Sequence, residues 1–391
     1  MKDKEIENLI KKEEKRQKNV VNLIASENYV SNDVRKALSS VFTNKYAEGY
    51  PHMRYYGGNE VVDELENIVK FRALKLFKLS ENSPTGGWSV NVQPYSGSPA
   101  NLAVYLALTP LGEKIMSLSL SMGGHLTHGH KVSVTGKLWN FIHYGVDQKT
   151  ELLDYEEIRK IALKNKPKLI VTGFTAYSRI IDFQKLRKIA DAVKAILMVD
   201  MSHFAGLVAG AVYPSPFKYA DVVTTTTHKT LRGPRAAIIF SKKEYTPAID
   251  RAVFPGLQGG PHANQIAAIG VCLKEAMAPD FKKYAKQVVK NAKILSYELQ
   301  RLGWRVVSGG TDSHLFLIDT WERGISGRVA QELLEKRGVI VNKNTIPYDV
   351  RSPMDPSGIR IGTAAVTTQG MKEKDMIKIA RAINKILSND H

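Results

Sequence analysis

The middle of the chain alternates apolar, β-branched runs with amphipathic helical segments. The runs KLIVTGF, AILMVD, DVVTTTT and AAIIFS alternate with segments such as DFQKLRKIADAVK, whose apolar residues recur at helical spacing. Near-continuous apolar runs joined by amphipathic helices are typical of strands that are buried on both faces of a parallel sheet. The pattern therefore predicts an α/β domain with a mostly parallel sheet, and functional groups are expected where its strands end.

The pattern changes after Pro279. A long amphipathic helix is expected over about 281–302, followed by the strand-like runs WRVVS, HLFLIDT, VIVNKN and IRIG and two more helical segments. This mixture predicts a smaller C-terminal α+β domain. The first residues predict a lysine-rich helix and an extended arm of the kind that often embraces a partner chain. We expect a helix and arm over 1–45, a large domain over 46–279 and a small domain over 280–391.

Composition places the chain among ordinary globular proteins. Of its 391 residues, 43% are hydrophobic and 24% are charged, which argues against disordered and fibrous classes. No run approaches the roughly 18 apolar residues of a membrane span, and the N-terminus lacks the apolar stretch of a signal peptide. A cytoplasmic protein with no membrane partner is expected. The single cysteine, Cys272, excludes an intrachain disulfide and argues against a cysteine-rich metal site.

The net charge raises the question of nucleic acid. Lysine and arginine number 56 against 38 acidic residues, which gives +18. The basic residues are interleaved with acidic ones on predicted helices such as KEKDMIKIARAINK, which indicates solvated helix faces. No specific nucleic-acid partner is therefore expected. RNA binding stays a minor alternative, to be recognised by saturable, sequence-selective binding near physiological salt.

Two strand ends carry residues that fit one cofactor. Asp200 ends the run AILMVD, and Lys229 follows the run DVVTTTTH. Taken singly, an aspartate there often caps a helix and a lysine often keeps its amine in solvent. Together they match the needs of pyridoxal phosphate, because a desolvated lysine amine forms the Schiff base and a carboxylate pairs with the pyridine nitrogen. The pair predicts a pyridoxal-phosphate site.

Three further segments could hold such a cofactor. The run QPYSGSPAN places hydroxyl and backbone N–H groups before a helix, where a phosphate binds well, and its candidates are Ser96, Gly97 and Ser98. The loop FPGLQGGP offers Gly260, although a tight turn is the commoner reason for such glycines. In MGGHLTHGH, His125 could stack on the ring. The histidines there lack a nearby acidic companion and zinc-like spacing, so no metal is predicted.

Two more segments suggest substrate contacts. Arg360 in DPSGIRIGTAAVT could grip a carboxylate in a bidentate manner, or it could form an ordinary surface ion pair. The irregular segment NKYAEGYPHMRYYGG could supply acid and base groups, or it could be an interaction loop. Its candidates are Tyr46, Glu48, Tyr55 and Tyr56.

These strings together resemble the serine hydroxymethyltransferase family, whose members are pyridoxal-phosphate enzymes of fold type I, the aspartate aminotransferase class. The resemblance covers nearly the whole chain and is carried by LIASENY, NKYAEGYP, RYYGG, VQPYSGSPAN, GGHLTHG, VDMSHFAGL, TTTTHKTLRGPR, FPGLQGGP, VIVNKN and SGIRIGT. It implies a fold type I large domain and a homodimer with shared active sites, with a tetramer left open. It also implies reversible conversion of L-serine and tetrahydrofolate to glycine and 5,10-methylenetetrahydrofolate through a pyridoxal-phosphate aldimine and quinonoid.

An alternative is a folate-independent pyridoxal-phosphate enzyme, such as a threonine aldolase or an aminotransferase. Such an enzyme shares the lysine and aspartate pair but leaves NKYAEGYP, RYYGG and VNKN unexplained. A folate requirement for serine cleavage would separate the two readings.

The resemblance also implies roles for individual residues. The catalytic set is Lys229, Glu48, Asp200, His125, Tyr56 and Thr226. The cofactor-binding set is Lys229, Ser96, Gly97, Ser98, His125, Thr175, Asp200, His203, Tyr46 and Gly260. The amino-acid substrate would contact Ser26, Glu48, Tyr56, His203 and Arg360. The folate would contact Glu48, Tyr55, Leu120, Gly124, Leu126 and Asn344.

Several of these residues would act across a dimer interface. In the family pattern the partner subunit contributes Tyr46, Glu48, Tyr56 and Gly260, and Glu48 transfers a proton near the serine hydroxyl. Thr175 departs from the serine that is frequent at its position, but it keeps the hydroxyl, so activity should survive. The segment LSENSPTGGW is expected at the surface, away from the chemistry.

Overall fold

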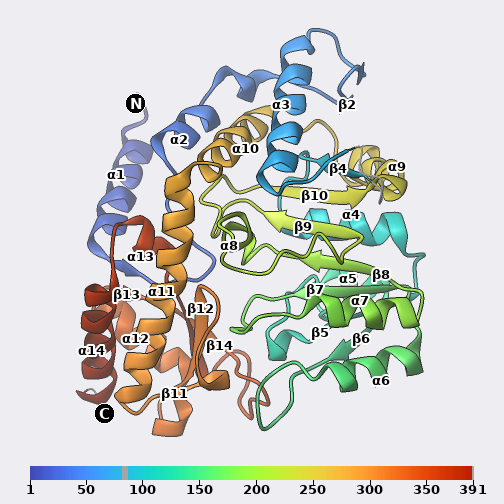
Figure 1. Ribbon diagram of the computed structural model, residues 1–391. Coiled ribbons are helices and arrows are strands. Elements are labelled where there is room, and N and C mark those ends of the chain that lie inside the picture. Colours follow the sequence, from blue (N-terminus) through green and yellow to red (C-terminus); the bar gives the residue numbers. More distant parts are fainter. Residues whose placement is uncertain (82–86, 390–391) are drawn as a thin grey trace.

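The computed structural model describes residues 1–81 and 87–389, so most of the segment expected at the surface before Trp88 lies outside the described residues. The large domain is a seven-stranded sheet between layers of helices (Figure 1). Its strands lie in the order β4 (Trp88–Asn91), β10 (Ala237–Lys242), β9 (Val222–Thr226), β8 (Ile196–Asp200), β7 (Leu169–Gly173), β5 (Lys114–Leu118) and β6 (Asn140–Tyr144).

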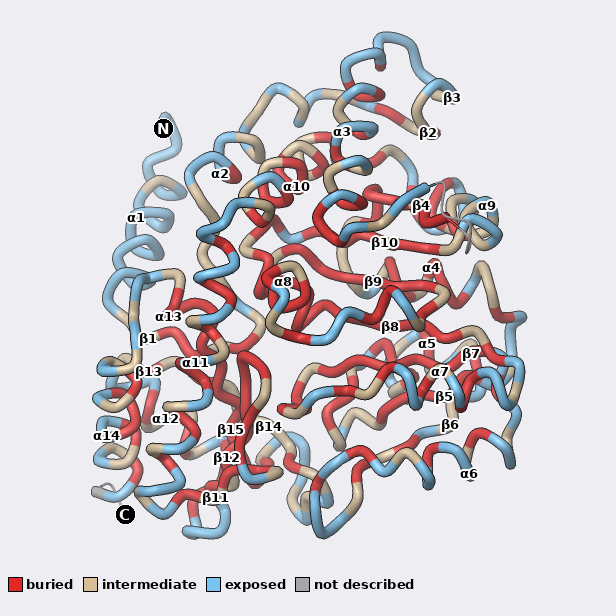
Figure 2. The backbone as a smooth tube through the Cα atoms, viewed as in Figure 1, coloured by how far each residue is buried: buried red, intermediate tan, exposed pale blue. Residues whose placement is uncertain are grey.

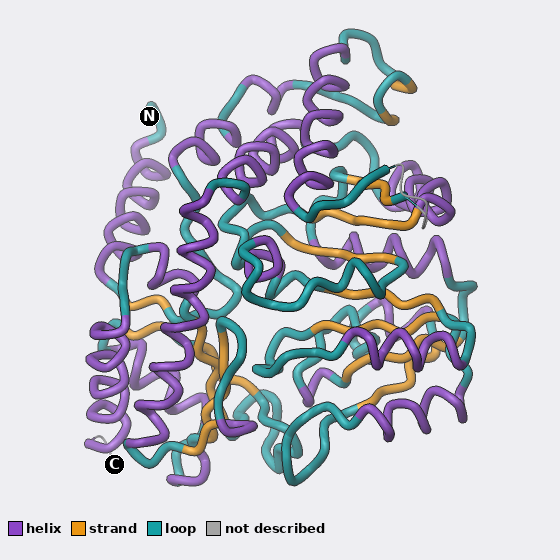
Figure 3. Tube along the Cα trace, viewed as in Figure 1, coloured by secondary structure: helices purple, strands orange, loops and turns teal. Residues whose placement is uncertain are grey.

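The strands from β9 to β6 are parallel, while β10 runs antiparallel to both β9 and β4. The prediction of a mostly parallel α/β sheet is therefore confirmed. Strands and helices alternate along this part of the chain, as Figure 3 shows. Helices that belong to the large domain are α3 (Glu60–Leu76), α4 (Gly97–Leu108), α5 (Val134–Leu138), α6 (Tyr155–Asn165), α7 (Phe183–Ala192), α8 (Ala205–Ala209), α9 (Thr246–Arg251) and α10 (Ala263–Ala276).

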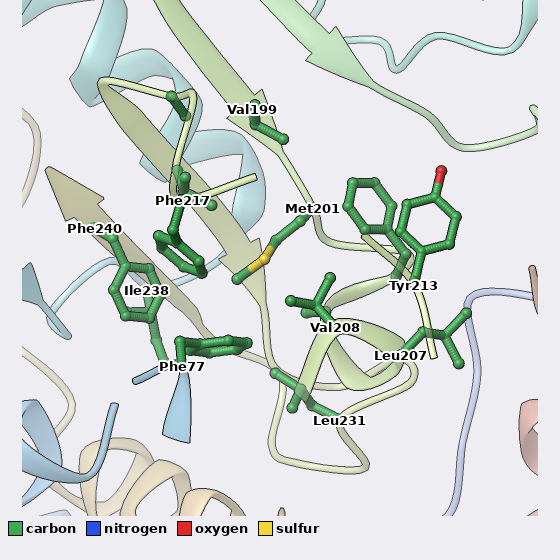
Figure 4. Packing of buried hydrophobic residues seen from close by; sticks show 14 of the residues in the cluster. Phe77, Val199, Met201, Leu207, Val208, Tyr213, Phe217, Leu231, Ile238 and Phe240 are labelled. Atoms are coloured by element: carbon green, nitrogen blue, oxygen red, sulfur yellow. The ribbon is translucent and has the colours of Figure 1, made fainter. Parts of the chain in front are cut away.

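Both faces of the parallel strands are buried, which explains their near-continuous apolar sequences. Side chains alternate between the faces of a strand. Ile170 and Val199 belong to the larger hydrophobic cluster, part of which is drawn in Figure 4. Val171 and Met198 belong to the cluster on the other face, together with Tyr105 of α4. Figure 2 shows the buried residues continuing along these strands.

The small domain is built on a four-stranded antiparallel sheet. Its strands lie in the order β11 (Arg305–Val306), β12 (Leu315–Asp319), β15 (Gly358–Gly362) and β14 (Asn342–Asn344). The helices around it are α12 (Gly327–Lys336), α13 (Ala364–Thr368) and α14 (Glu373–Asn389).

One long helix joins the two domains. The helix expected over 281–302 is α11 (Pro279–Arg301), so this prediction is confirmed within two residues. Phe281 packs in the large-domain core, whereas Leu295 lies in the core of the small domain. Because its two halves contribute to different cores, α11 holds the domains together.

The N-terminal arm docks on the small domain. After α1 (Lys4–Asn19), strand β1 (Val21–Asn22) pairs with β13 (Val339–Ile340). Leu23 is fully buried in the small-domain core, and its carbonyl accepts a 2.8 Å hydrogen bond from Gly362. A Cβ atom on Gly362 would lie 2.4 Å from the Ala25 Cα, so only glycine fits this contact.

Three further short elements belong to the arm and the loop that follows it. They are α2 (Asn32–Leu38), β2 (Gly49–Tyr50) and β3 (Met53–Arg54). The division of the chain at residues 45 and 279 stays a prediction. Among the helices in the described residues, none combines the length and the apolar character that crossing a membrane requires.

Candidate active site

A polar pocket of about 350 Å³ lies where the parallel strands β7, β8 and β9 end. Strand β15 of the small domain contributes Arg360 to its wall. The structure brings eleven of the predicted residues together here, namely Ser26, Ser96, Gly97, Ser98, His125, Thr175, Asp200, His203, Thr226, Lys229 and Arg360. The pocket also has lining residues that the sequence reading did not single out, among them Ser202, His228 and Arg235.

The Lys229 amine lies in this pocket with no ion-pair partner among the described residues. Lys229 follows β9 and is 8% exposed, and its backbone carbonyl accepts a hydrogen bond from Asn28. No carboxylate in the described residues lies within ion-pair distance of its Nζ atom. Burial lowers the pKa of Lys229 to about 8, while the charge of Asp200 opposes the shift and those of Arg360 and Arg235 add to it. Near neutral pH a useful fraction of this amine is therefore uncharged and nucleophilic.

Asp200 is oriented by four donors. Its Oδ1 accepts hydrogen bonds from the Ser202 backbone N–H (3.0 Å) and hydroxyl (2.6 Å). Its Oδ2 lies 2.9 Å from the Asn101 amide nitrogen and 3.4 Å from His128 Nε2. Burial by itself would raise the pKa of Asp200, but the hydrogen bonds from His128 and Ser202 outweigh it and hold the pKa well below its usual range. The pocket thus contains a carboxylate that stays ionised.

The tautomers of the two neighbouring histidines follow from their contacts. The backbone N–H of His125 donates to His128 Nδ1 (3.2 Å), so the proton of neutral His128 lies on Nε2, toward Asp200. His125 Nδ1 accepts from the Thr127 backbone N–H (3.2 Å), which leaves its proton on Nε2. Burial lowers the pKa of His125 to about 4, and His128 adds to the effect. The neutral His125 ring is suited to stacking on a cofactor.

Asp200 is the acidic companion that the sequence reading of the histidine segment missed, because it lies 72 residues from His128 along the chain. The described residues nevertheless include no group of three or more histidine, cysteine, aspartate or glutamate side chains arranged to hold a metal ion.

The end of the pocket at α4 has the character of a phosphate site. Ser96 occupies the N-cap position of α4 without a side-chain capping hydrogen bond. A Cβ atom on Gly97 would lie 2.7 Å from the Thr226 methyl group, so glycine is needed there. Two buried polar atoms, Thr226 Oγ1 and His228 Nδ1, have no hydrogen-bond partner among the described residues. Buried polar atoms are rarely left unpaired. Together with the free N–H groups of a helix N-terminus, they fit the phosphate of pyridoxal phosphate.

Arg360 is a buried cation that lacks an anion. Its Nη1 donates to the Thr175 carbonyl (2.7 Å) and its Nε to Asn342 Oδ1 (3.1 Å), while Nη2 lies 3.5 Å from Ser26 Oγ. No carboxylate of the described chain pairs with it, and burial lowers the pKa of Arg360 to about 10. A buried charge is costly unless it is paired. The pocket therefore offers a fixed guanidinium to an anionic group of a bound molecule.

A second buried histidine, His314, lies within hydrogen-bond distance of His203. His203 Nδ1 lies 3.2 Å from Nε2 of His314, which is fully buried at the start of β12. Burial and the charges of Lys229 and Arg360 lower the pKa of His203 well below its usual value. The pair joins the two domains at the pocket. His314 was missed because a lone histidine before an apolar strand has no distinguishing pattern.

The residues predicted to act across an interface, Tyr46, Glu48, Tyr56 and Gly260, form a separate cluster, and Tyr55, which was predicted at the folate, lies with them. Tyr46, Tyr55 and Tyr56 are 54%, 75% and 49% exposed. The Tyr46 hydroxyl donates to Glu48 Oε1 (3.1 Å), and a Cβ atom on Gly260 would lie 3.4 Å from the Tyr46 ring. None of these five residues lines the Lys229 pocket of the described chain. A single chain thus brings them together on its surface but leaves them outside its own site.

A buried arginine fixes the loop that carries this cluster. Arg54 Nε donates to Asp63 (2.8 Å), its Nη2 to Glu66 (2.7 Å), and its Nη1 to the carbonyl oxygens of Gly49 (2.6 Å) and Ala47 (3.0 Å). The two carboxylates lie one turn apart on α3. Because Arg54 bonds both the helix and the backbone on either side of Glu48, it holds Glu48 at a defined position. The spacing of Asp63 and Glu66, i and i+3 on one helix, was the sequence signal that could have revealed this binding site for the Arg54 side chain.

The positions expected at the folate do not share one pocket in a single chain. Gly124 accepts a hydrogen bond from the Thr175 hydroxyl (2.6 Å), and a Cβ atom on it would lie 2.1 Å from the Leu118 carbonyl. Leu120 lines a cavity of about 1050 Å³ that also includes Thr345, the neighbour of Asn344. Leu126 lines a different cavity of about 450 Å³.

Comparisons with known proteins agree with this geometry. A profile of the serine hydroxymethyltransferase family matches residues 1–383. A curated serine hydroxymethyltransferase from Desulfotalea psychrophila (strain LSv54 / DSM 12343) is 53% identical over 387 residues, which cover 99% of this chain and 89% of that protein. The chain belongs to the serine hydroxymethyltransferase family.

Proposed function

We propose that the Lys229 pocket is the place where this chain converts L-serine and tetrahydrofolate to glycine, 5,10-methylenetetrahydrofolate and water. The observation that carries the proposal is the juxtaposition of two groups at neighbouring strand ends. One is a buried amine with no ion-pair partner in the described part of the chain, and the other is a carboxylate held ionised by four donors. Nothing in the comparisons favours a folate-independent aldolase. We propose a cytoplasmic location for the enzyme.

The residues of the pocket would divide the binding of pyridoxal phosphate among them. Lys229 would supply the amine and Asp200 would pair with the ring nitrogen, while His125 would stack on the ring. Thr175 and His203 would lie near the phenolic oxygen. The phosphate would be bound at the start of α4 by Ser96, Gly97 and Ser98, with Thr226 and His228 adding the donors that the single chain leaves unpaired.

The chemistry depends on where protons and charges are held. Bound pyridoxal phosphate supplies a ring that accepts the electron pair left when serine loses its hydroxymethyl carbon. Asp200 would keep the ring nitrogen protonated, which makes the ring a better acceptor. Arg360 would fix the substrate carboxylate and thereby the orientation of the bond that breaks. Glu48 would move a proton to or from the serine hydroxyl oxygen as the carbon is passed to the folate nitrogen.

The lowered pKa of Lys229 predicts how capture of the cofactor depends on pH. Only the neutral amine attacks an aldehyde, so the rate at which the apoprotein binds pyridoxal phosphate covalently should rise about tenfold per pH unit and level off near pH 8. Stopped-flow absorbance would measure this rate from the growth of the absorbance band of the covalently bound cofactor. Lys229→Ala is the control, in which this band should not form. A rate that keeps rising to pH 10 would contradict a buried, deprotonated amine.

We propose that each site is completed by Tyr46, Glu48, Tyr56 and Gly260 of a second copy of the chain. These residues gather on the surface of one chain, outside its own pocket, and Arg54 holds the loop rigid. Tyr55, Leu120, Gly124, Leu126 and Asn344 would contact the folate next to Glu48. A homodimer, or a tetramer made of two such dimers, would place Glu48 of one chain beside the Lys229 pocket of the other.

Subunit mixing tests the shared site. Lys229→Ala and Glu48→Gln chains should each form weakly active homodimers, whereas a mixed dimer contains one site with both wild-type residues. After equal mixing, half of the dimers are mixed and half of their sites are intact, so activity should recover to about a quarter of wild type. The recovery is measured after unfolding and refolding the two chains together.

The control mixes Lys229→Ala chains with Asp200→Asn chains. Both residues line the pocket of their own chain, so every site of the mixed dimer lacks one of them and no activity should be recovered. Equal recovery in both mixtures, or none in the first, would overturn the assignment of Glu48 to the partner's site.

A further inference from the structure

Helix α4 places one amide between two of the proposed cofactor contacts. Asn101, one turn after the Ser96–Ser98 segment, is 1% exposed. Its Nδ2 donates to Asp200 Oδ2 (2.9 Å) and to Thr127 Oγ1 (2.9 Å). Its Oδ1 accepts from the Thr224 hydroxyl (2.8 Å). Both amide protons and the amide oxygen of Asn101 therefore form hydrogen bonds.

The orientation of this amide is determined by its partners. An ionised Asp200 can only accept hydrogen bonds, so the amide nitrogen must face it and the oxygen must face Thr224. The Thr127 hydroxyl accepts from Asn101, and its own proton is free to point at His125 Nδ1, 2.7 Å away. The chain of donors thus runs from Thr224 through Asn101 and Thr127 to the ring of His125.

We propose that Asn101 is a positioning residue that holds the Asp200 carboxylate and the His125 ring in the orientations the cofactor needs. The inference rests on the proposed function, because it takes Asp200 as the partner of the ring nitrogen and His125 as the stacking ring. Since the start of α4 is the proposed phosphate site, this one helix would set the phosphate, the carboxylate and the stacking ring relative to one another.

Asn101→Asp tests this role because it keeps the shape and replaces a donor by an acid. Two carboxyl groups about 2.9 Å apart would share a proton, and the pair would lose it only above the usual range of a carboxylic acid. The Asp200 carboxylate would then carry less negative charge beside the ring nitrogen at neutral pH. The other titratable groups near Asp200 are His125, His128, Lys229 and Tyr105.

The expected results separate positioning from stability. In Asn101→Asp, kcat at saturating serine should fall about 10- to 100-fold while the serine KM changes little. Some of the lost kcat should return as pH rises, because the carboxyl pair then becomes fully ionised. The absorbance band of bound pyridoxal phosphate should shift with pH in this variant over a range where the wild-type band is constant, and the cofactor Kd should rise. Asn101→Ala should weaken cofactor binding without the new pH dependence.

Asn291→Asp is the matched control. Asn291 is also fully buried, donates both amide protons, to Thr367 (2.9 Å) and Met371 (2.9 Å), and accepts from Gln287 (2.8 Å). This change should lower the thermal midpoint but leave the cofactor spectrum and kcat unchanged. If Asn101→Asp and Asn101→Ala behave like the control, Asn101 is merely structural and the inference fails.

Asp200→Asn separates this failure from a failure of the proposed function. If Asp200→Asn loses kcat while the Asn101 variants keep wild-type kcat and cofactor spectra, only the role of Asn101 is overturned. A wild-type spectrum and kcat in Asp200→Asn would overturn the pairing of Asp200 with the ring nitrogen, and the inference with it.

Discussion

Lys229→Ala is expected to lower kcat for serine conversion by at least about 1,000-fold. Lys229 is the one lysine among the described residues that line the pocket, and its pKa of about 8 makes it the nucleophile available near neutral pH. Arg235 and Arg360, the two arginines among the lining residues, carry guanidinium groups that are not nucleophilic at this pH. No other side chain of the pocket can replace the amine. Single-turnover formation of 5,10-methylenetetrahydrofolate measures the loss.

Stability distinguishes a chemical loss from misfolding. The Lys229 amine is buried and has no ion-pair partner in the described chain, so removing it should leave the thermal midpoint of the apoprotein unchanged or raise it. Lys229→Arg retains a positive charge but cannot form the Schiff base, and it should be equally inactive. More than a few per cent of wild-type kcat in Lys229→Ala would contradict the assigned role.

The central sheet could be predicted because its strands are buried on both faces. In β7, β8 and β9 nearly every side chain is buried, so the apolar runs stand out from the amphipathic helices between them. The pairing of β1 with β13 could not be predicted, because strands of two residues carry no periodicity. The antiparallel direction of β10 could not be predicted either, because its apolar sequence reads like those of the parallel strands β7, β8 and β9.

The site shows a similar division. Asp200 and Lys229 were predictable because each follows an apolar run at a strand end, where ligands bind in open α/β sheets. Asn101 and His128 could not be predicted as site residues, because an asparagine within a helix and one of three neighbouring histidines do not by themselves indicate a functional site. Their role appears only when the fold brings them to Asp200 from 99 and 72 residues away.

Arg360→Lys should raise the KM for serine by about 30-fold, with a smaller effect on kcat, because lysine keeps the charge but loses the bidentate contact, at a cost near the lower end of the about 2–5 kcal/mol for losing the charged partner outright. The guanidinium is held at Nη1 by the Thr175 carbonyl and at Nε by Asn342, so it meets a carboxylate in a fixed orientation. The lysine ammonium is a single point of charge on a flexible stem and cannot reproduce this fork. Steady-state kinetics and a glycine titration followed by absorbance measure the effect.

Serinol, which lacks the carboxylate, is the control ligand for this prediction. Its affinity should not change in Arg360→Lys, and an equal loss for serine and serinol would show that Arg360 supports the pocket rather than binding the substrate. The apoprotein gives an independent check. Because Arg360 is buried without an anion among the described residues, Arg360→Met should not lower the thermal midpoint of the unliganded protein. A buried charge that weakens the empty protein but tightens the complex would select a substrate with a carboxylate.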